Sequence, residues 1–313
     1  MDVYDRIHAR EPVKDVLQYI SDNNVELEPT QFLNQLEVVQ ERNSYYAKQF
    51  LKLLIPYLEK IGSELSETVY EPYINLLAVN APDPQSSDII QYRFGSYKLL
   101  IKETPSLICA QGTTGFRTWE AALFLCHFMT QNPHLFATDD GGSSMLELGC
   151  GTGIISILYT LMQKEKEKEK NGSLENPIFV TDGDSSLLQQ VKDNFLLNDI
   201  TAVPELRFQR LRWNEDELLQ AERDKKVGLI LGADITYDTS VIPDLVGCLK
   251  QFAGADAYIS CTERNMATLE AFENELTRNC LDFEIVATIS PESFKQISVR
   301  NITTSIRIYR VRT

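Results

Sequence analysis

The first part of the chain carries apolar residues at helical spacing. Over residues 13–77 they recur every three or four positions, and no strand-like alternation interrupts them. A polar stretch with two prolines, "NAPDPQSSD" at residues 80–88, follows this region. We therefore expect a helical domain over residues 1–85 and a second domain over residues 86–313.

The next stretch alternates between apolar and polar residues. It reads "QYRFGSYKLLIKE" over residues 91–103 and has a glycine near its centre. This pattern predicts a hairpin or a bulged strand, and we expect it to cover the edge of the second domain.

Beyond residue 143, short apolar runs alternate with longer helical patterns. We expect seven strands, at residues 145–148, 178–181, 206–210, 229–233, 257–261, 283–289 and 305–311. Helices fill most of the gaps, which predicts an α/β fold with a parallel sheet and helices on both faces. No helix is expected between the last two strands, and the final one alternates as "SIRIYRV", so these two should pair antiparallel. The charged run "QKEKEKEK" at residues 163–170 should extend a helix into water.

Composition narrows the class of partner. The chain has 313 residues, 43% of them hydrophobic, and a formal net charge of −15. Nucleic-acid binding depends on Lys and Arg neutralising phosphates, so we expect no direct nucleic-acid partner and favour a basic protein partner. The six cysteines are scattered and there are only three histidines, which predicts no metal site. We see no signal peptide and no run of transmembrane length, so we expect a cytoplasmic protein with no membrane partner.

A glycine-rich stretch follows the first strand of the expected sheet. In "MLELGCGTGIISI" the glycines Gly149, Gly151 and Gly153 separate a strand pattern from a helical one. The spacing matches neither the dinucleotide fingerprint nor the phosphate loop. Glu147, just before the glycines, would repel phosphates but suits a ligand that bears an amine. We therefore favour S-adenosylmethionine, which carries a sulfonium and an ammonium, over an ordinary strand–glycine–helix turn.

Other candidate residues lie where the second and third strands of this sheet end. In open α/β sheets ligands bind beyond the carboxyl ends of the strands. In "VTDGDSSLL", Asp182 is the better candidate for binding ribose hydroxyls, and Asp184 is either the alternative or the cap of the next helix. In "LRWNEDEL", Trp213 either flanks an adenine ring or packs at the rim of the core.

The fourth strand ends in "GADITYD". Ala233 counts among the candidate cofactor-binding residues, and Asp234 and Tyr237 would line the entrance for the methyl acceptor. The alternative makes Asp234 a helix cap and Tyr237 a core residue. Methyltransferases that modify bases usually carry two prolines in this turn, and this chain has none.

A further stretch, "AQGTTGFRTWEAALFL", precedes the first strand. It becomes helical at Thr118, a candidate N-cap, with Glu120 in the first turn and Trp119 at the helix entrance. We expect it to fold over the open side of the cofactor as a lid. The alternative is an ordinary capped helix whose tryptophan packs in the core.

The stretches "GTTGFRTWEAALFL", "LELGCGTG", "TDGDSSLL", "LRW" and "DITYD" occur in an order and at a spacing that resemble the family-16 seven-β-strand protein methyltransferases. The resemblance covers residues 91–313 and is strongest to the elongation factor 2 lysine methyltransferases, fungal members included. It implies a Rossmann-like seven-stranded sheet with an antiparallel last strand, and a helical N-terminal domain. We expect this N-terminal domain to recognise the protein substrate, because it is separate from the cofactor motifs. The resemblance also implies cofactor contacts and an Asp-x-x-Tyr signature, at Trp119, Glu147, Gly149, Asp182, Trp213, Asp234 and Tyr237.

The resulting expectation is an S-adenosylmethionine-dependent protein-lysine N-methyltransferase. Its substrate would be translation elongation factor 2, and the enzyme would act as a monomer. Asp234 and Tyr237 would orient the lysine amine during transfer. Two alternatives stay open at this point: a methyltransferase of another protein, a small molecule or RNA, and a non-catalytic module that kept the fold.

Overall fold

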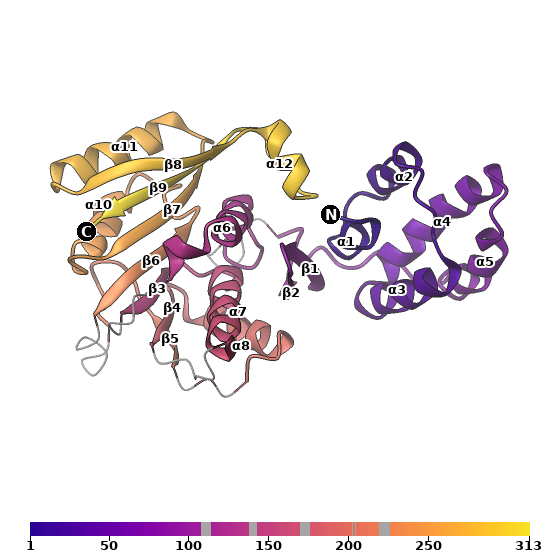
Figure 1. Ribbon diagram of the computed structural model, residues 1–313, viewed down its shortest axis with the longest axis horizontal. Helices are drawn as coiled ribbons and strands as arrows, with labels where there is room; N and C mark the ends of the chain where they lie inside the picture. Colours follow the sequence, from indigo (N-terminus) through magenta and orange to yellow (C-terminus); the bar gives the residue numbers. More distant parts are fainter. Residues whose placement is uncertain (108–113, 138–142, 170–175, 202, 204, 219–225) are drawn as a thin grey trace. The chain divides into compact units, whose positions relative to one another are not determined.

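A computed structural model describes the chain except for residues 108–113, 138–142, 170–175, 202, 204 and 219–225 (Figure 1). The chain divides into two compact units. The first comprises Met1–Arg93 and Lys102–Leu107, and the second comprises Phe94–Ile101 and Ile108–Thr313. We call them the helical unit and the sheet unit.

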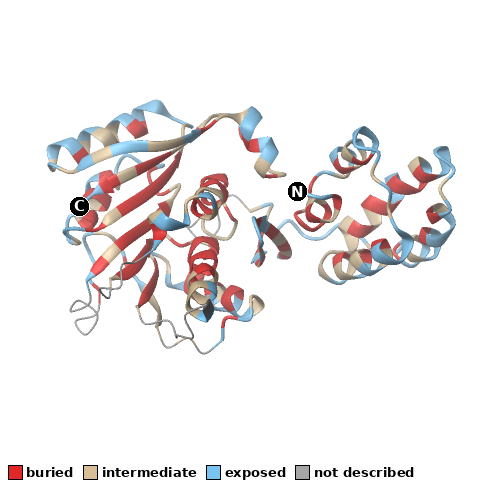
Figure 2. Cartoon of the chain, viewed as in Figure 1, coloured by how far each residue is buried: buried red, intermediate tan, exposed pale blue. Residues whose placement is uncertain are grey.

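The helical unit contains five helices before its hairpin strand. They are α1 (Val3–His8), α2 (Val13–Asp22), α3 (Pro29–Arg42), α4 (Ser44–Lys60) and α5 (Leu65–Asn75). Their inward faces bury a core that includes Phe32, Phe50 and Val69 (Figure 2). The apolar periodicity predicted this helical region correctly, but it missed α1, which lies before residue 13 and has only six residues.

The alternating stretch forms the expected hairpin, made of β1 (Asp88–Phe94) and β2 (Tyr97–Glu103). The two strands form a sheet of their own, and the expectation that the hairpin covers the edge of the second domain stays a prediction. Asn198, which follows α8, holds β2 in place through hydrogen bonds to the Leu100 backbone N–H (2.8 Å) and carbonyl (2.7 Å).

The sheet unit is built on seven strands that form one sheet. Its strands are β3 (Ser144–Leu148), β4 (Ile178–Asp182), β5 (Leu206–Arg210), β6 (Val227–Ala233), β7 (Asp256–Thr262), β8 (Asp282–Ile289) and β9 (Ile306–Arg312). The strand order is β5-β4-β3-β6-β7-β9-β8. Strands β3 to β7 are parallel, and β9 pairs antiparallel with both β7 and β8. The α/β fold and the antiparallel end of the sheet are therefore confirmed.

Helices cover both faces of this sheet, α6, α7 and α8 on one and α10 and α11 on the other (Figure 1). The helical segments of the unit are α6 (Glu120–Gln131), η1 (Pro133–Phe136), α7 (Ile154–Glu169), α8 (Ser185–Leu197), α10 (Ile242–Leu249), α11 (Met266–Arg278) and α12 (Pro291–Ile297). Helix α12 contradicts the expectation that no helix lies between the last two strands. It is a short helix, and Ser290 caps it by accepting a hydrogen bond from the Ser293 N–H.

The charged run at residues 163–170 continues α7 as far as Glu169, and Lys170 lies outside the described residues. Among the described residues, no helix is both long and apolar enough to cross a bilayer. Strand β3 has β4 on one side and β6 on the other, so the direction in which successive strands are added to the sheet reverses at β3. Ligands of open α/β sheets bind at such a switch point, at the carboxyl ends of the strands.

Candidate active site

The three glycines form the loop between β3 and α7. All three have positive φ, +63° at Gly149, +51° at Gly151 and +79° at Gly153, a region that other residues rarely adopt. Two of these glycines also leave too little room for a side chain. A Cβ on Gly149 would lie 2.7 Å from Ile235, and one on Gly153 would lie 2.6 Å from Val191. Backbone conformation and packing therefore both require glycine here.

Asp182 ends β4 and binds the glycine loop. Its Oδ2 accepts a hydrogen bond from the Gly151 N–H (3.0 Å), and its Oδ1 accepts one from the Asp184 N–H (3.0 Å). Burial raises the pKa of Asp182, and these backbone hydrogen bonds oppose the rise. Asp184 is the N-cap of α8 and accepts a hydrogen bond from the Ser186 N–H (2.8 Å). Of these two aspartates, Asp182 is therefore the one whose side chain joins the glycine loop to the end of β4.

Asp234 follows β6 in a left-handed conformation, with φ +52°. Its carboxylate accepts hydrogen bonds from the Thr262 N–H (3.0 Å) and hydroxyl (3.1 Å), and pairs with Arg264 (3.1 Å). Burial raises its pKa, while Arg264 and Thr262 lower it. Asp234 thus binds the end of β7 and caps no helix, so the helix-cap alternative is wrong.

Tyr237 lies three residues further on. Its side chain is 65% exposed, so the alternative that placed it in the core is wrong as well.

Trp119 occupies the N-cap position of α6. Its indole N–H donates to the Thr114 carbonyl (3.0 Å), and the guanidinium carbons of Arg117 and Arg264 lie 4.5 and 4.6 Å from the ring centre. Thr118 is not the cap, contrary to expectation. It is buried and its hydroxyl bonds the Thr152 hydroxyl (2.9 Å). Arg264 therefore contacts both Trp119 and Asp234.

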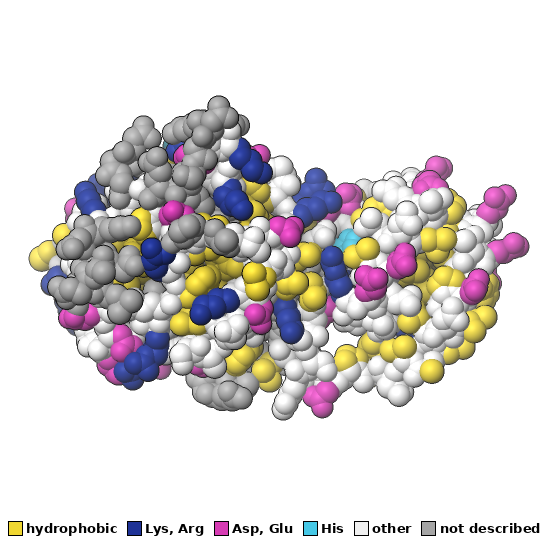
Figure 3. Space-filling view, turned by 90° about the horizontal axis from the view of Figure 1, so that it is seen from below, with side chains coloured by type: hydrophobic (Ala, Val, Ile, Leu, Met, Phe, Trp, Pro, Cys, Tyr) yellow, Lys and Arg dark blue, Asp and Glu magenta, His cyan; other side chains and the backbone are white. Residues whose placement is uncertain are grey.

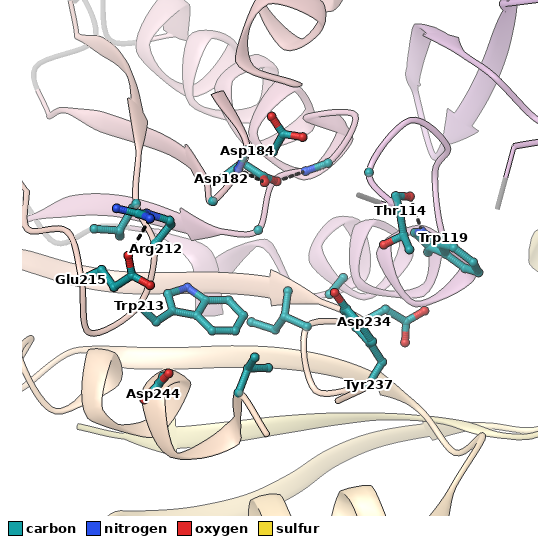
Figure 4. A pocket seen from close by; sticks show the side chains of 18 residues that line it. Thr114, Trp119, Asp182, Asp184, Arg212, Trp213, Glu215, Asp234, Tyr237 and Asp244 are labelled. Carbon is teal, nitrogen blue, oxygen red and sulfur yellow. Dashed lines mark hydrogen bonds and ion pairs between the residues drawn. The ribbon is translucent and has the colours of Figure 1, made fainter. Parts of the chain in front are cut away.

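One pocket of about 450 Å³ brings most of the predicted residues together (Figure 4). Its volume lies within the range of small-molecule sites. The predicted residues that line it are Trp119, Gly149, Gly151, Asp182, Asp184, Trp213, Ala233, Asp234 and Tyr237. Gly153 and Glu147 do not line it. From the expected lid, Thr114, Gly115 and Trp119 contribute to the wall, whereas residues 110–113 lie outside the described residues.

Glu147 needs a correction, because its side chain is buried beside α7 and does not line the pocket. Its Oε2 accepts hydrogen bonds from the Ser156 N–H (3.2 Å) and the Ser156 hydroxyl. Its Oε1 has no hydrogen-bond partner among the described residues. Burial raises the pKa of Glu147 to about 8. In this position Glu147 holds the start of α7 and does not present its charge to a ligand.

Nine lining residues were missed from the sequence: Thr114, Gly115, Gly183, Leu211, Arg212, Glu215, Ile235, Val241 and Asp244. A signal existed for Arg212 and Glu215, which flank Trp213 at a strand exit. Asp244 lies in the first turn of α10, ten residues after Asp234, and its sequence gives no such signal.

The lining suits a cation that carries an aromatic base. The lining is more acidic than basic, because it contains one guanidinium, that of Arg212, and five carboxylates. The carboxylates belong to Asp182, Asp184, Glu215, Asp234 and Asp244. Trp213 is half-buried, packs against the core and also lines the pocket, so its packing at the rim of the core is confirmed and its contact with an adenine ring stays a prediction. These features fit the sulfonium, ammonium and adenine of S-adenosylmethionine. In the described part of the chain, no three His, Cys, Asp or Glu side chains are grouped as metal ligands.

Comparison with known proteins agrees with this geometry. A family model described as lysine methyltransferase matches residues 101–278, more than half of the chain. The protein-lysine N-methyltransferase EFM3 of Saccharomyces cerevisiae is 34% identical, over 98% of this chain and 97% of that protein. The human protein-lysine N-methyltransferase EEF2KMT is 28% identical, over 77% and 72%.

Among solved structures, a SAM-dependent methyltransferase from Aquifex aeolicus matches with a TM-score of 0.40 and 12% identity, over 58% of this chain and 88% of that one. The family model and the yeast relative, which spans nearly the whole chain, decide the assignment. The chain therefore belongs to the lysine methyltransferase family and is a protein-lysine N-methyltransferase with S-adenosylmethionine as its methyl donor.

Proposed function

We propose that this enzyme methylates a lysine of translation elongation factor 2 in the cytoplasm. The observation that carries the proposal is the single pocket that joins the glycine loop and Asp182 to Asp234 and Tyr237. The name of the human relative, EEF2KMT, points to elongation factor 2 as that protein's substrate. The net charge of −15 suits a basic protein surface and disfavours direct contact with nucleic acid.

The lining residues divide the binding of the cofactor between them. Asp182 is placed to accept hydrogen bonds from ribose hydroxyls, because a carboxylate can accept from both hydroxyls of a diol. Trp213 offers an aromatic face to the adenine. S-adenosylmethionine, when bound, supplies an electrophilic methyl group. Glu147 acts at a distance in this scheme, by holding α7 and with it the glycine loop.

Asp234 and Tyr237 serve the acceptor lysine. Thr262 and Arg264 fix the Asp234 carboxylate, so it presents a constant orientation to an incoming amine. The lysine must react as a neutral amine, and with an ordinary pKa of about 10.4 its deprotonation at pH 7 costs about 4.6 kcal/mol. Partial desolvation in the pocket reduces this cost, and alignment by Asp234 and Tyr237 contributes further.

The first test measures activity and one catalytic residue together. Purified enzyme, elongation factor 2 and isotope-labelled S-adenosylmethionine should yield a labelled lysine, located by mass spectrometry. Asp234→Asn should lower kcat by about 100-fold, as expected for loss of an aligned charged group, and leave the cofactor Kd within about threefold. Asparagine is the suitable replacement because it tolerates the positive φ of this position better than alanine does.

Asp193→Asn serves as the matched control, since it removes an exposed carboxylate from α8 outside the pocket. It should behave as the wild type. Label on some other protein, with none on elongation factor 2, would overturn the proposed substrate. Unchanged turnover in Asp234→Asn would remove Asp234 from the catalytic site.

A further inference from the structure

The helical unit exposes apolar side chains on α5 and just after it. Three of them, which we call the apolar strip, are Tyr70, Ile74 and Leu77, with exposed fractions of 41, 59 and 51%. The opposite face of α5 already packs in the core through Leu65 and Val69. The strip is therefore a second apolar face that the fold of the helical unit does not use.

Two contacts place the strip beside α4. The Tyr70 hydroxyl donates to Glu59 (2.5 Å), and the Lys48 ammonium donates to the Leu77 carbonyl (2.6 Å). Helices α4 and α5 therefore run antiparallel, with residues 48–59 of the first beside residues 70–77 of the second. Tyr70, Ile74 and Leu77 are spaced four and three residues apart, so they follow one face of the helical segment.

The border of the strip is acidic on the α5 side. Residues 61–79 contain Glu64, Glu67 and Glu71, all exposed, and no lysine or arginine. On α4 the border is mixed, since Lys48, Lys52 and Lys60 accompany Glu59. Figure 3 shows hydrophobic side chains at the surface of the helical unit with acidic side chains around them. An apolar surface with such a border suits a partner segment that is apolar in the middle and basic at its flanks.

We propose that the apolar strip docks a segment of the protein substrate whose apolar side chains are flanked by lysine or arginine. The inference rests on the proposed function and gives its substrate a second contact, made by residues that do not line the pocket. Contiguous apolar patches with a polar border mark protein interaction sites more often than isolated exposed side chains do. A symmetric contact between two copies is disfavoured, because it would bring the glutamates of both α5 helices together.

The test separates docking from chemistry in the full-length enzyme. Ile74→Ser combined with Leu77→Ser should raise KM for elongation factor 2 about tenfold, with kcat and the cofactor Kd within about twofold of the wild type. Glu67→Lys combined with Glu71→Lys should raise KM similarly, and this second increase should shrink at high salt. Leu196→Ser is the matched control, because Leu196 is 58% exposed on α8, and it should leave KM unchanged.

Three outcomes would overturn the proposal. Unchanged KM in both double variants, alongside normal wild-type methylation, would overturn the docking strip alone. A wild-type dimer that the Ile74→Ser/Leu77→Ser variant converts to monomer, by sedimentation, would make the strip a self-association face. Absence of elongation factor 2 methylation by the wild-type enzyme would overturn the proposed substrate and with it this docking partner.

Discussion

Glu147 and Asp234 are both buried carboxylates at strand ends, but their hydrogen bonds differ. Asp234 accepts from Thr262 and pairs with Arg264, which stabilises its ionised form. Glu147 has only Ser156 as a hydrogen-bond partner among the described residues, and Asp182 nearby disfavours a second negative charge. Burial thus favours the neutral acid at Glu147 more strongly, and its pKa reaches about 8.

The raised pKa of Glu147 makes stability depend on pH. In the unfolded chain this carboxyl has its ordinary pKa near 4.5, so the folded state holds a proton that the unfolded state releases between about pH 4.5 and 8. The free energy of unfolding therefore contains a contribution that is complete below pH 4.5. It is lost as the pH rises through 8.

Glu147→Gln should remove this contribution, because glutamine stays neutral at every pH. The free energy of unfolding of the variant minus that of the wild type should therefore increase from pH 5 to pH 8, on the order of 1 kcal/mol or more. Urea titrations of the cofactor-free proteins at both pH values measure this difference. Glu270→Gln, at an exposed position on α11, should show no such trend. A difference between Glu147→Gln and the wild type that does not change with pH would show that Glu147 is ionised in the fold.

At the scale of elements, two aspartates in the turn from β4 to α8 form different hydrogen bonds, although they are only two residues apart. Asp184 satisfies an N–H of the first turn of α8, as capping residues do. Asp182 bonds backbone N–H groups on both sides, at Gly151 and at Asp184 itself. Both aspartates line the pocket, but of the two only Asp182 forms a hydrogen bond with the glycine loop.

Substitution should separate these two tasks. Asp184→Ala should lower the free energy of unfolding by about 1 kcal/mol through loss of the cap, and change the cofactor Kd by less than about threefold. Asp182→Asn should weaken cofactor binding at least about tenfold, since it loses charge-assisted hydrogen bonds. Calorimetry with S-adenosylmethionine and chemical denaturation supply the two readouts. The reverse ranking of affinities would assign the ribose to Asp184.

Across the whole molecule, the excess of acidic residues favours association with a basic partner. A net charge of −15 attracts a positively charged surface over several ångströms, mainly by raising the rate of encounter. Salt screens such long-range attraction, because the Debye length falls to about 8 Å at physiological ionic strength. Short contacts inside the pocket are screened less.

Protein substrate and cofactor should therefore respond differently to salt. KM for elongation factor 2 should rise severalfold between about 50 and 300 mM NaCl, while kcat stays nearly constant. The cofactor Kd should change less over the same range. Steady-state kinetics at fixed saturating cofactor, with calorimetry at each salt concentration, would check both trends. A KM that does not depend on salt would contradict electrostatic recruitment of the substrate.

Much of the fold follows from local patterns. A buried strand, a glycine loop and a helix need particular residues at neighbouring positions, so the Gly149–Gly153 loop and the alternation of strands and helices were readable from the sequence. Residues that end parallel strands meet at one sheet edge, which is why Asp182, Trp213 and Asp234 could be assigned to a common site. Helix α12 was missed because a segment of seven residues is too short to show a helical periodicity.

The amino-acid order by itself determined the fold class, the location of the pocket and most of its polar lining. Only the tertiary structure decided where each side chain points. It turned Glu147 away to Ser156, bonded Thr118 to Thr152, and placed Arg264 against both Trp119 and Asp234. Such contacts join residues far apart in the chain, and their geometry depends on packing between elements, which local periodicity does not encode.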